Sequence, residues 1–179
     1  MTDQPLTVNE VLRHMNHDFL NHLQLIKMNL ALENVERANE VLMNIAQNCN
    51  RFFVINSLHA ERLVEWLHTC EWRFPAINMT IDCAITDALP AKWDHVIRDY
   101  LETTLQHIAN YIDAIVEQNC QINIISTKDY FELNVEIKGR WTADYKQIPI
   151  DSNELVAEVE SYSHSLWRYS VLGSKEVIY

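Results

Sequence analysis

The sequence predicts an α+β protein in which a helical hairpin precedes a mixed α/β segment. From Leu6 to about Leu32 apolar residues recur every three or four positions, and no Pro or Gly interrupts them, which indicates a long amphipathic helix. After Ser57 the pattern changes, and stretches with apolar residues at alternate positions appear, as is typical of strands. We therefore divide the chain into a helical segment over 1–57 and an α+β segment over 58–179.

The helical segment is expected to contain two antiparallel helices. The second helix begins after Glu33-Asn34 and continues to about Phe53, and this short connection favours a hairpin. Two helices alone cannot bury two apolar stripes, so we expect the hairpins of two chains to pair as a four-helix bundle in a homodimer. The alternative is that the hairpin packs against its own C-terminal segment.

The α+β segment is expected to mix helices with strands. Pro75 ends the first helix, because the residue before a proline avoids the helical region. Asp151 or Ser152 is the expected cap of the last helix, and Gly173-Ser174 the expected turn of a final hairpin. The expected elements in chain order are a helix over 58–72, a strand over 77–85, a long helix over 91–117, strands over 121–126 and 131–138, a helix over 151–162, and strands over 167–172 and 175–179.

Glycine is scarce, which excludes several phosphate-binding motifs. The chain of 179 residues has two glycines, Gly139 and Gly173, where average usage would supply roughly a dozen. A P-loop, a dinucleotide-binding turn and a glycine-rich nucleotide lid each need several glycines close together, so that the backbone can approach phosphate. We therefore expect none of them here.

Charge and cysteine spacing exclude further classes. The formal net charge of −11 argues against binding duplex nucleic acid or an anionic membrane. The four cysteines form no C-x-x-C pair, so neither a zinc ribbon nor a redox motif is expected, and we interpret them as buried thiols in a reducing cytosol. Without an apolar run long enough for a signal peptide or membrane span, a cytoplasmic protein is the expectation.

His17 is the candidate for chemistry. On an ideal helix it lies roughly 150° from the centre of the apolar stripe and should face solvent. Arg13, Asn21 and Gln24 share its face, and their N–H groups could compensate charge on a phosphoryl group transferred through the imidazole. Asp18 could reach one ring nitrogen and fix the tautomer, so that the other nitrogen attacks.

The stretch Asn16-His17-Asp18-Phe19-Leu20-Asn21-His22-Leu23-Gln24-Leu25-Ile26-Lys27-Met28-Asn29-Leu30 resembles the phosphoacceptor helix of the sporulation-initiation phosphotransferase B family. The family pattern is approximately R-H-D-x-x-N-x-L-Q-L-I-K-G-N-L, and sensor kinases of the citrate and fumarate class share the shorter H-D-x-x-N-x-L-Q. Two residues depart from the pattern. Asn16 replaces the usual Arg, which puts contacts to the phosphoryl group or partner in doubt unless Arg13 substitutes, and Met28 replaces a frequent Gly.

The resemblance implies a phosphorelay phosphotransferase that controls entry into sporulation. His17 would take a phosphoryl group from the aspartyl phosphate of one response regulator and pass it to a second regulator. The hairpin over 1–57 would be the dimerisation and phosphotransfer domain, and 58–179 would resemble a degenerate histidine-kinase ATP-binding domain.

The resemblance combines with the scarcity of glycine to disfavour a kinase. Asn110 is the single asparagine of the helix over 91–117, and the following segment has only the two glycines, so phosphorylation from ATP is not expected. No cofactor is expected on this chain, and Mg²⁺ would come with the acidic pocket of the partner regulator.

Two rival interpretations remain open. His14 and His17 could bind a metal across the dimer, although no Glu-x-x-His pattern accompanies them. A non-catalytic dimeric module would use the same bundle to bind a response regulator or sensor kinase without taking phosphate.

Overall fold

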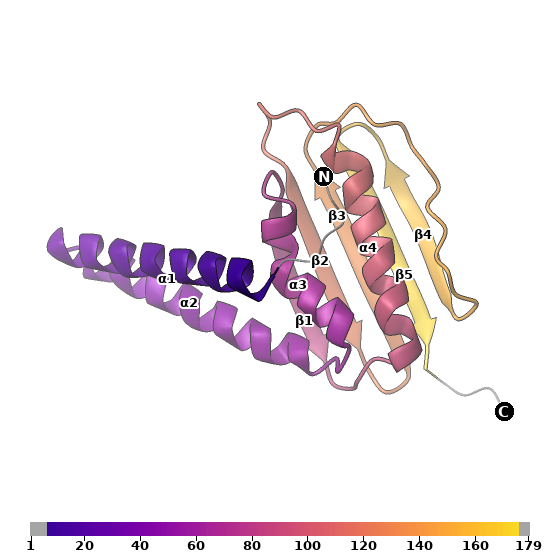
Figure 1. Cartoon of the computed structure of the whole chain (residues 1–179), viewed down its shortest axis with the longest axis horizontal. Helices are drawn as coiled ribbons and strands as arrows, with labels where there is room; N and C mark the ends of the chain where they lie inside the picture. Colours follow the sequence, from indigo (N-terminus) through magenta and orange to yellow (C-terminus); the bar gives the residue numbers. More distant parts are fainter. Residues whose placement is uncertain (1–6, 176–179) are drawn as a thin grey trace. The chain divides into compact units, whose positions relative to one another are not determined.

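The computed structural model describes residues 7–175, and the chain falls into two units, Met1–Phe53 and Val54–Tyr179 (Figure 1). We call them the N-terminal unit and the C-terminal unit and describe each by itself. The α+β class expected from the sequence is confirmed.

The N-terminal unit is a helical hairpin built from α1, Val8–Ala31, and most of α2, Val35–Asn56. Thr7 caps α1 in a capping box with Glu10. The side chain of Thr7 accepts a hydrogen bond from the backbone N–H of Glu10, and the side chain of Glu10 accepts one from the backbone N–H of Thr7. At the turn, Glu33 adopts a left-handed φ of 59°, which ends α1 and lets the chain reverse within a few residues. The expected hairpin is therefore present.

The hairpin buries few side chains. Within residues 7–53, only Asn29 and Ala38 are buried. Much of the apolar stripe that indicated the helix is instead exposed by 45–58% of its surface; these residues are Leu12, Met15, Phe19, Leu23 and Leu30. A single hairpin thus leaves its main apolar stripe open to solvent.

The C-terminal unit has a five-stranded sheet with the strand order β1-β2-β3-β5-β4. Strand β1 pairs in parallel with β2, and all other pairs are antiparallel. The strands are β1 Asn78–Ile85, β2 Asn119–Ser126, β3 Tyr130–Lys138, β4 Leu155–Tyr162 and β5 Leu166–Ser174. The parallel pair requires a crossover, and the helix after β1 supplies it.

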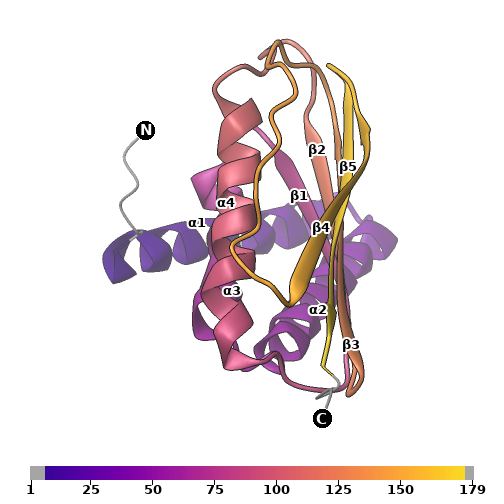
Figure 2. The ribbon, with the colours of Figure 1, turned by 90° about the vertical axis from the view of Figure 1, so that its right-hand side faces the viewer.

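Two helices cover one face of this sheet, α3 Glu61–Arg73 and α4 Asp94–Ala109, the latter preceded by the short 3₁₀ turn Ala91–Trp93 (Figure 2). Alternate residues of each central strand are buried beneath them, such as Ile122, Leu133 and Val171. The intervening strand residues face the other side and are mostly polar. The single core of the unit lies between the helices and the sheet.

Polar contacts join the two helices of that layer. The N-terminus of α3 lacks a side-chain cap of its own, and Asp94 at the start of α4 accepts hydrogen bonds from the backbone N–H groups of Arg62 and Leu63 instead. Buried Glu102 accepts a hydrogen bond of 2.5 Å from Trp66 Nε1. Both contacts join residues more than thirty positions apart, so local sequence patterns do not reveal them.

Helices α3 and α4 of the C-terminal unit are both shorter than expected. Helix α3 begins at Glu61 and not near Leu58, because His59 takes a left-handed φ of 51°. Helix α4 ends at Ala109 and not near Glu117. Beyond it the chain folds into a loop in which buried Gln118 donates to the carbonyl of Asp113 and accepts from the N–H of Arg140.

That loop explains the position of one glycine. The Gln118 side chain occupies the space that a Cβ at residue 139 would take, so Gly139 permits a close approach of two chain segments. The prediction that the helix continues past Ala109 was wrong, because this tertiary contact determines the backbone conformation there and helical periodicity does not.

The helix expected over 151–162 is wrong, and β4 stands in its place. Ser152 does accept hydrogen bonds from the N–H groups of Glu154 and Leu155, as a helix cap would. The turn leads into a strand, since β5 offers an antiparallel partner to β4, with one irregularity between Val159 and Ser161. Val156 and Val159 also favour a pleated conformation over a helix.

The hairpin turn expected at Gly173-Ser174 is also wrong. Strand β5 runs through Gly173 to Ser174, and the actual hairpin joins β4 to β5 around Ser163. A Cβ at Gly173 would lie 2.7 Å from the Trp93 ring and from Leu155, so this glycine permits close packing and not a turn. The last expected strand, over 175–179, falls almost wholly outside the described residues.

One cysteine departs from the expectation of buried thiols. Cys70 and Cys120 are buried and Cys83 is half-buried, but Cys49 is exposed on α2. The expectation failed at Cys49 because a single hairpin leaves most of this helix open to solvent.

Candidate functional site

His17 lies on α1 with its imidazole in solvent, as the helical wheel predicted. Its side chain is 71% exposed. Two neighbours on the same helix contact one ring nitrogen, Nδ1: Asp18 Oδ1 and Asn21 Nδ2 each lie 3.2 Å from it. Within residues 7–175 no hydrogen bond is recorded to the other nitrogen, Nε2. The geometry therefore leaves Nε2 accessible to a reacting group.

The two contacts on Nδ1 are alternatives, because a neutral imidazole carries one proton. When Nδ1 holds the proton, it donates to Asp18, and Nε2 keeps its lone pair. When Nε2 holds the proton, Nδ1 can accept from the amide of Asn21 instead. Asp18 thus favours the tautomer in which the exposed nitrogen is nucleophilic, and Asn21 competes with it.

The other predicted site residues, Arg13 and Gln24, are exposed on α1. Within residues 7–175 no recorded hydrogen bond or ion pair joins either of them to His17. The pKa of the Glu10 carboxyl is lowered mainly by hydrogen bonds from Thr7, with a smaller contribution from the charge of Arg13. The structure thus brings together three of the five predicted residues, His17, Asp18 and Asn21, and leaves Arg13 and Gln24 without a contact to the imidazole.

The other two histidines of the helix are less exposed than His17. His14 and His22 are half-buried. Across residues 7–175 there is no cluster of three or more His, Cys, Asp or Glu side chains placed to hold a metal ion. The metal interpretation of His14 and His17 therefore gains no support from a single chain.

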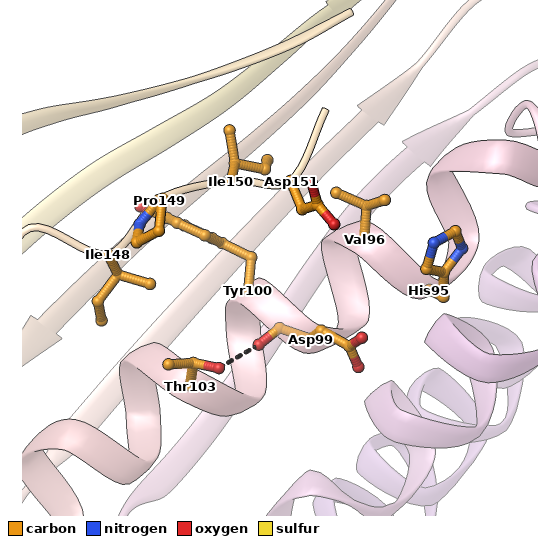
Figure 3. A pocket seen from close by; sticks show the side chains of 9 residues that line it. All are labelled: His95, Val96, Asp99, Tyr100, Thr103, Ile148, Pro149, Ile150 and Asp151. Carbon is orange, nitrogen blue, oxygen red and sulfur yellow. Dashed lines mark hydrogen bonds between the residues drawn. The ribbon is translucent and has the colours of Figure 1, made fainter. Parts of the chain in front are cut away.

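The C-terminal unit contains a hollow that the sequence did not predict. It lies between α4 and the segment that precedes β4, with a volume of about 260 Å³ (Figure 3). Its lining includes no Lys, no Arg and neither glycine. Asn110, the candidate asparagine of this helix, is not part of the lining and lies beyond the end of α4. No sequence signal could have revealed the hollow, because the two segments that form it are some fifty residues apart.

Comparison with known families identifies the helical segment. Residues 1–57 match the family described as "Sensor_kinase_SpoOB-type, alpha-helical domain". The resemblance expected from the motif around His17 is therefore confirmed for this segment, which is 57 of the 179 residues. The match supports a role related to phosphotransfer in two-component signalling.

Solved structures give weaker likenesses. The Acinetobacter baumannii histidine kinase AdeS is 10% identical with a TM-score of 0.42, over 90% of this chain and 98% of that one. The mycobacterial sensor histidine kinase MprB is 7% identical with a TM-score of 0.39, over 64% and 93%. The histidine kinase ThkA in complex with response regulator protein TrrA is 12% identical with a TM-score of 0.43, over 94% and 62%.

Among curated proteins there is no significant match. Within the described residues no helix combines the length and the apolar character needed to cross a membrane.

Proposed function

We propose that this protein is a phosphotransferase of a two-component phosphorelay and that His17 is its phosphoacceptor. His17 takes the phosphoryl group from the aspartyl phosphate of one response regulator and passes it to the aspartate of a second. The family resemblance makes sporulation initiation the proposed process and the cytoplasm the proposed location. The observation that carries the proposal is the exposed Nε2 of His17, with Nδ1 in contact with Asp18, inside a segment that matches the family.

The first transfer uses the lone pair of His17 Nε2. This pair attacks the phosphorus, the bond between phosphorus and the aspartyl oxygen breaks, and its electron pair returns to the regulator's carboxylate. Positive charge then grows on the imidazole, and the carboxylate of Asp18 stabilises the Nδ1–H that shares it. The second transfer reverses these bonds, with a new regulator's carboxylate as the attacking group.

The supporting residues act on the phosphoryl oxygens. The transition state of phosphoryl transfer is loose, so the protein contributes mainly positioning and compensation of charge. Arg13 and Gln24 are exposed near His17 and are free to turn toward a phosphoryl group when a regulator docks. Mg²⁺ belongs to the regulator's acidic pocket in this scheme, and this chain is proposed to bind no cofactor.

The proposal excludes ATP as the phosphoryl donor. In the C-terminal unit the lining of the hollow beside α4 offers no Lys and no Arg, and it includes two carboxylates, Asp99 and Asp151. A triphosphate would meet like charge there without compensation. The scarcity of glycine supports the same conclusion, because a phosphate-covering lid needs flexible backbone.

Dimerisation is part of the proposal. The N-terminal unit exposes an apolar stripe along α1 that includes Met15, Phe19 and Leu23. Exposed apolar residues at helical spacing mark a surface that another helix pair can cover. We therefore propose a homodimer through a four-helix bundle, with His17 on the outer side of each α1.

The decisive experiment mixes the full chain with a response regulator phosphorylated on its aspartate. The parent protein should acquire an acid-labile phosphate, and His17→Ala should acquire less than about one thousandth as much, since this variant lacks the proposed attacking nitrogen. His22→Ala is the matched control, because this half-buried histidine lies on the same helix, and it should be labelled like the parent.

Three outcomes would overturn the proposal. Equal labelling of His17→Ala and the parent would move the phosphoacceptor elsewhere. Binding of regulators without labelling would make the protein a non-catalytic module for a response regulator or sensor kinase. Labelling by ATP and Mg²⁺ alone would make it a kinase.

A further inference from the structure

The segment before β4 forms a strap across α4. We define the strap as residues 142–154. At its start, Tyr162 donates its hydroxyl proton to the carbonyl of Ala143 at 2.7 Å, and His107 Nε2 lies 2.8 Å from the carbonyl of Asp144. At its end, Glu154 accepts a 2.9 Å hydrogen bond from the indole of Trp93. The strap is thus held at both ends, and the span between them lines one side of the hollow.

The walls of the hollow are largely apolar. From α4 they include Val96 and the ring of Tyr100, and from the strap Ile148, Pro149 and Ile150 (Figure 3). A volume of about 260 Å³ suits a small organic molecule, since it lies just below the range of about 300–1,000 Å³ typical of drug-sized sites. An apolar body of that size would gain by leaving water.

Tyr100 contributes a hydroxyl group to the lining of the hollow. The residue is 4% exposed, and its ring packs edge-on against Tyr169 at a centroid distance of 5.5 Å. Within residues 7–175 no hydrogen bond is recorded for its hydroxyl, and Figure 3 shows the side chain running from α4 toward Pro149 of the strap. A hydroxyl that faces the hollow can donate one hydrogen bond to a molecule bound there and accept others from it.

The same hydroxyl stays protonated under ordinary conditions. Burial, with a smaller effect of Tyr145, raises the pKa of Tyr100 to about 12. The group is therefore neutral, with one proton to donate and lone pairs that can accept an N–H.

The charge beside the hollow is negative. Asp151, on the strap, is exposed, and within residues 7–175 it has no recorded hydrogen bond or ion pair; Figure 3 shows its carboxylate facing α4 over Val96. Asp99, on α4, already pairs with Arg98 at 2.6 Å. Asp151 is therefore the carboxylate available to a ligand, in a chain whose net charge of −11 also favours cations.

We propose that the hollow between α4 and the strap binds a small organic cation with an apolar body. The apolar part would lie against Val96, Ile148 and Ile150, and the ammonium group would pair with Asp151. The site belongs to the C-terminal unit alone and does not depend on phosphotransfer at His17.

The test titrates the full chain with three probes of similar size and different charge, and follows the methyl NMR signals of the hollow. The probes are 2-phenylethylammonium, neutral 2-phenylethanol and anionic 3-phenylpropanoate. We expect saturable shifts of Ile148 and Ile150 with the ammonium, and binding at least about fivefold weaker for the alcohol, as for loss of an ion pair at a partly exposed site. The anion should leave these signals unchanged.

Asp151→Asn should weaken binding of the ammonium about fivefold and leave binding of the alcohol unchanged. Asp129→Asn is the matched control, because it removes the same charge from an exposed turn outside the lining and should bind like the parent. Equal affinity for the ammonium and the alcohol, unchanged binding in Asp151→Asn, or shifts confined to other parts of the chain would each overturn the proposal. Displacement of the ammonium by ATP and Mg²⁺ at the same signals would assign the hollow to a nucleotide instead.

Discussion

The two units of this chain treat their apolar residues in opposite ways. In the C-terminal unit, large side chains such as Trp66, Leu101 and Ile137 are almost fully buried in one continuous core. In the N-terminal unit, Phe19 and Leu23 of α1 keep 58% and 45% of their surface in solvent. The buried core can therefore stabilise the C-terminal unit by itself, whereas the apolar stripe of the hairpin needs a second surface to cover it.

This difference matches the division of labour that we propose. A phosphoacceptor must be reachable by two different regulators, and His17 lies on an exposed helix whose opposite stripe is free for dimerisation. The buried indoles, thiols and hydroxyls of the C-terminal unit cannot serve that purpose, because no partner protein can reach them. For that reason we propose that the chemistry belongs to the N-terminal unit.

The largest effect is expected when the same substitution, Leu to Ala, is made in each of the two units. Leu101→Ala, at a fully buried position of α4, should lower the free energy of unfolding of the C-terminal unit by about 2–5 kcal/mol, because the change removes apolar contacts and leaves a cavity. This loss should not depend on protein concentration. Urea unfolding followed by tryptophan fluorescence measures it, since all five tryptophans lie in the C-terminal unit.

Leu23→Ala is the matched change in the N-terminal unit. It should leave the tryptophan transition unchanged and shift the dimer toward monomer, as measured by light scattering over a range of concentrations. A parent protein that stays monodisperse and monomeric at micromolar concentration would contradict the dimer and would mean that a different surface covers the stripe.

Alkaline pH should weaken the C-terminal unit selectively. Burial raises the pKa of the Cys70 thiol from 9.0 to about 12, and burial also raises the pKa of Cys120. Above pH 9 the unfolded chain has lost thiol protons that the folded chain retains, so the free energy of unfolding falls as pH rises. We expect a loss of about 1.4 kcal/mol per buried thiol at pH 10.

Unfolding by urea at pH 8, 9 and 10 measures this slope. Replacing both thiols, as Cys70→Ala with Cys120→Ala, should lower stability at every pH and flatten the dependence between pH 8 and 10. An unchanged slope in that variant would assign the effect to other groups. Exposed Cys49 provides an internal contrast, because a thiol reagent should modify it in the native protein while Cys70 and Cys120 react only on unfolding.

The smallest expected effect concerns the tautomer of His17. Asp18→Asn should slow phosphoryl transfer about tenfold, because an exposed carboxylate that orients an imidazole contributes far less than a buried one. Asn21→Ala should be less harmful than Asp18→Asn on this ground, since it removes the contact that competes for Nδ1. Single-turnover transfer from a phosphorylated regulator measures both rates. A larger loss in Asn21→Ala would show that its amide acts on the phosphoryl group and not on the ring.

Prediction from the sequence succeeded where the apolar spacing within a single helix or strand was enough to identify that element. The helices of the hairpin and the strands β1, β2 and β3 follow from apolar spacing, because each has one apolar face and one polar face along its whole length. The group around His17 followed in the same way. Residues four positions apart on a helix are neighbours in space, so helical spacing places Asn21 beside the imidazole. Asp18 is the next residue and lies about 100° around the helix, and its side chain still reaches Nδ1.

Prediction failed where two distant segments decide the outcome. The stretch before Tyr162 has a helix-like cap at Ser152, yet it forms β4 because β5 offers backbone partners that a local pattern does not show. The hollow beneath the strap could not be found either, since α4 and the strap meet only in the folded chain.

The amino-acid sequence by itself determined the hairpin, the exposed position of His17 and the lack of glycine-rich phosphate loops, because helical periodicity and backbone freedom are local properties. Only the tertiary structure decided the roles of the two glycines. Each sits where another segment leaves no room for a Cβ, Gly139 against Gln118 and Gly173 against Trp93. Close approach is a property of pairs of segments, and the sequence of either segment alone does not contain it.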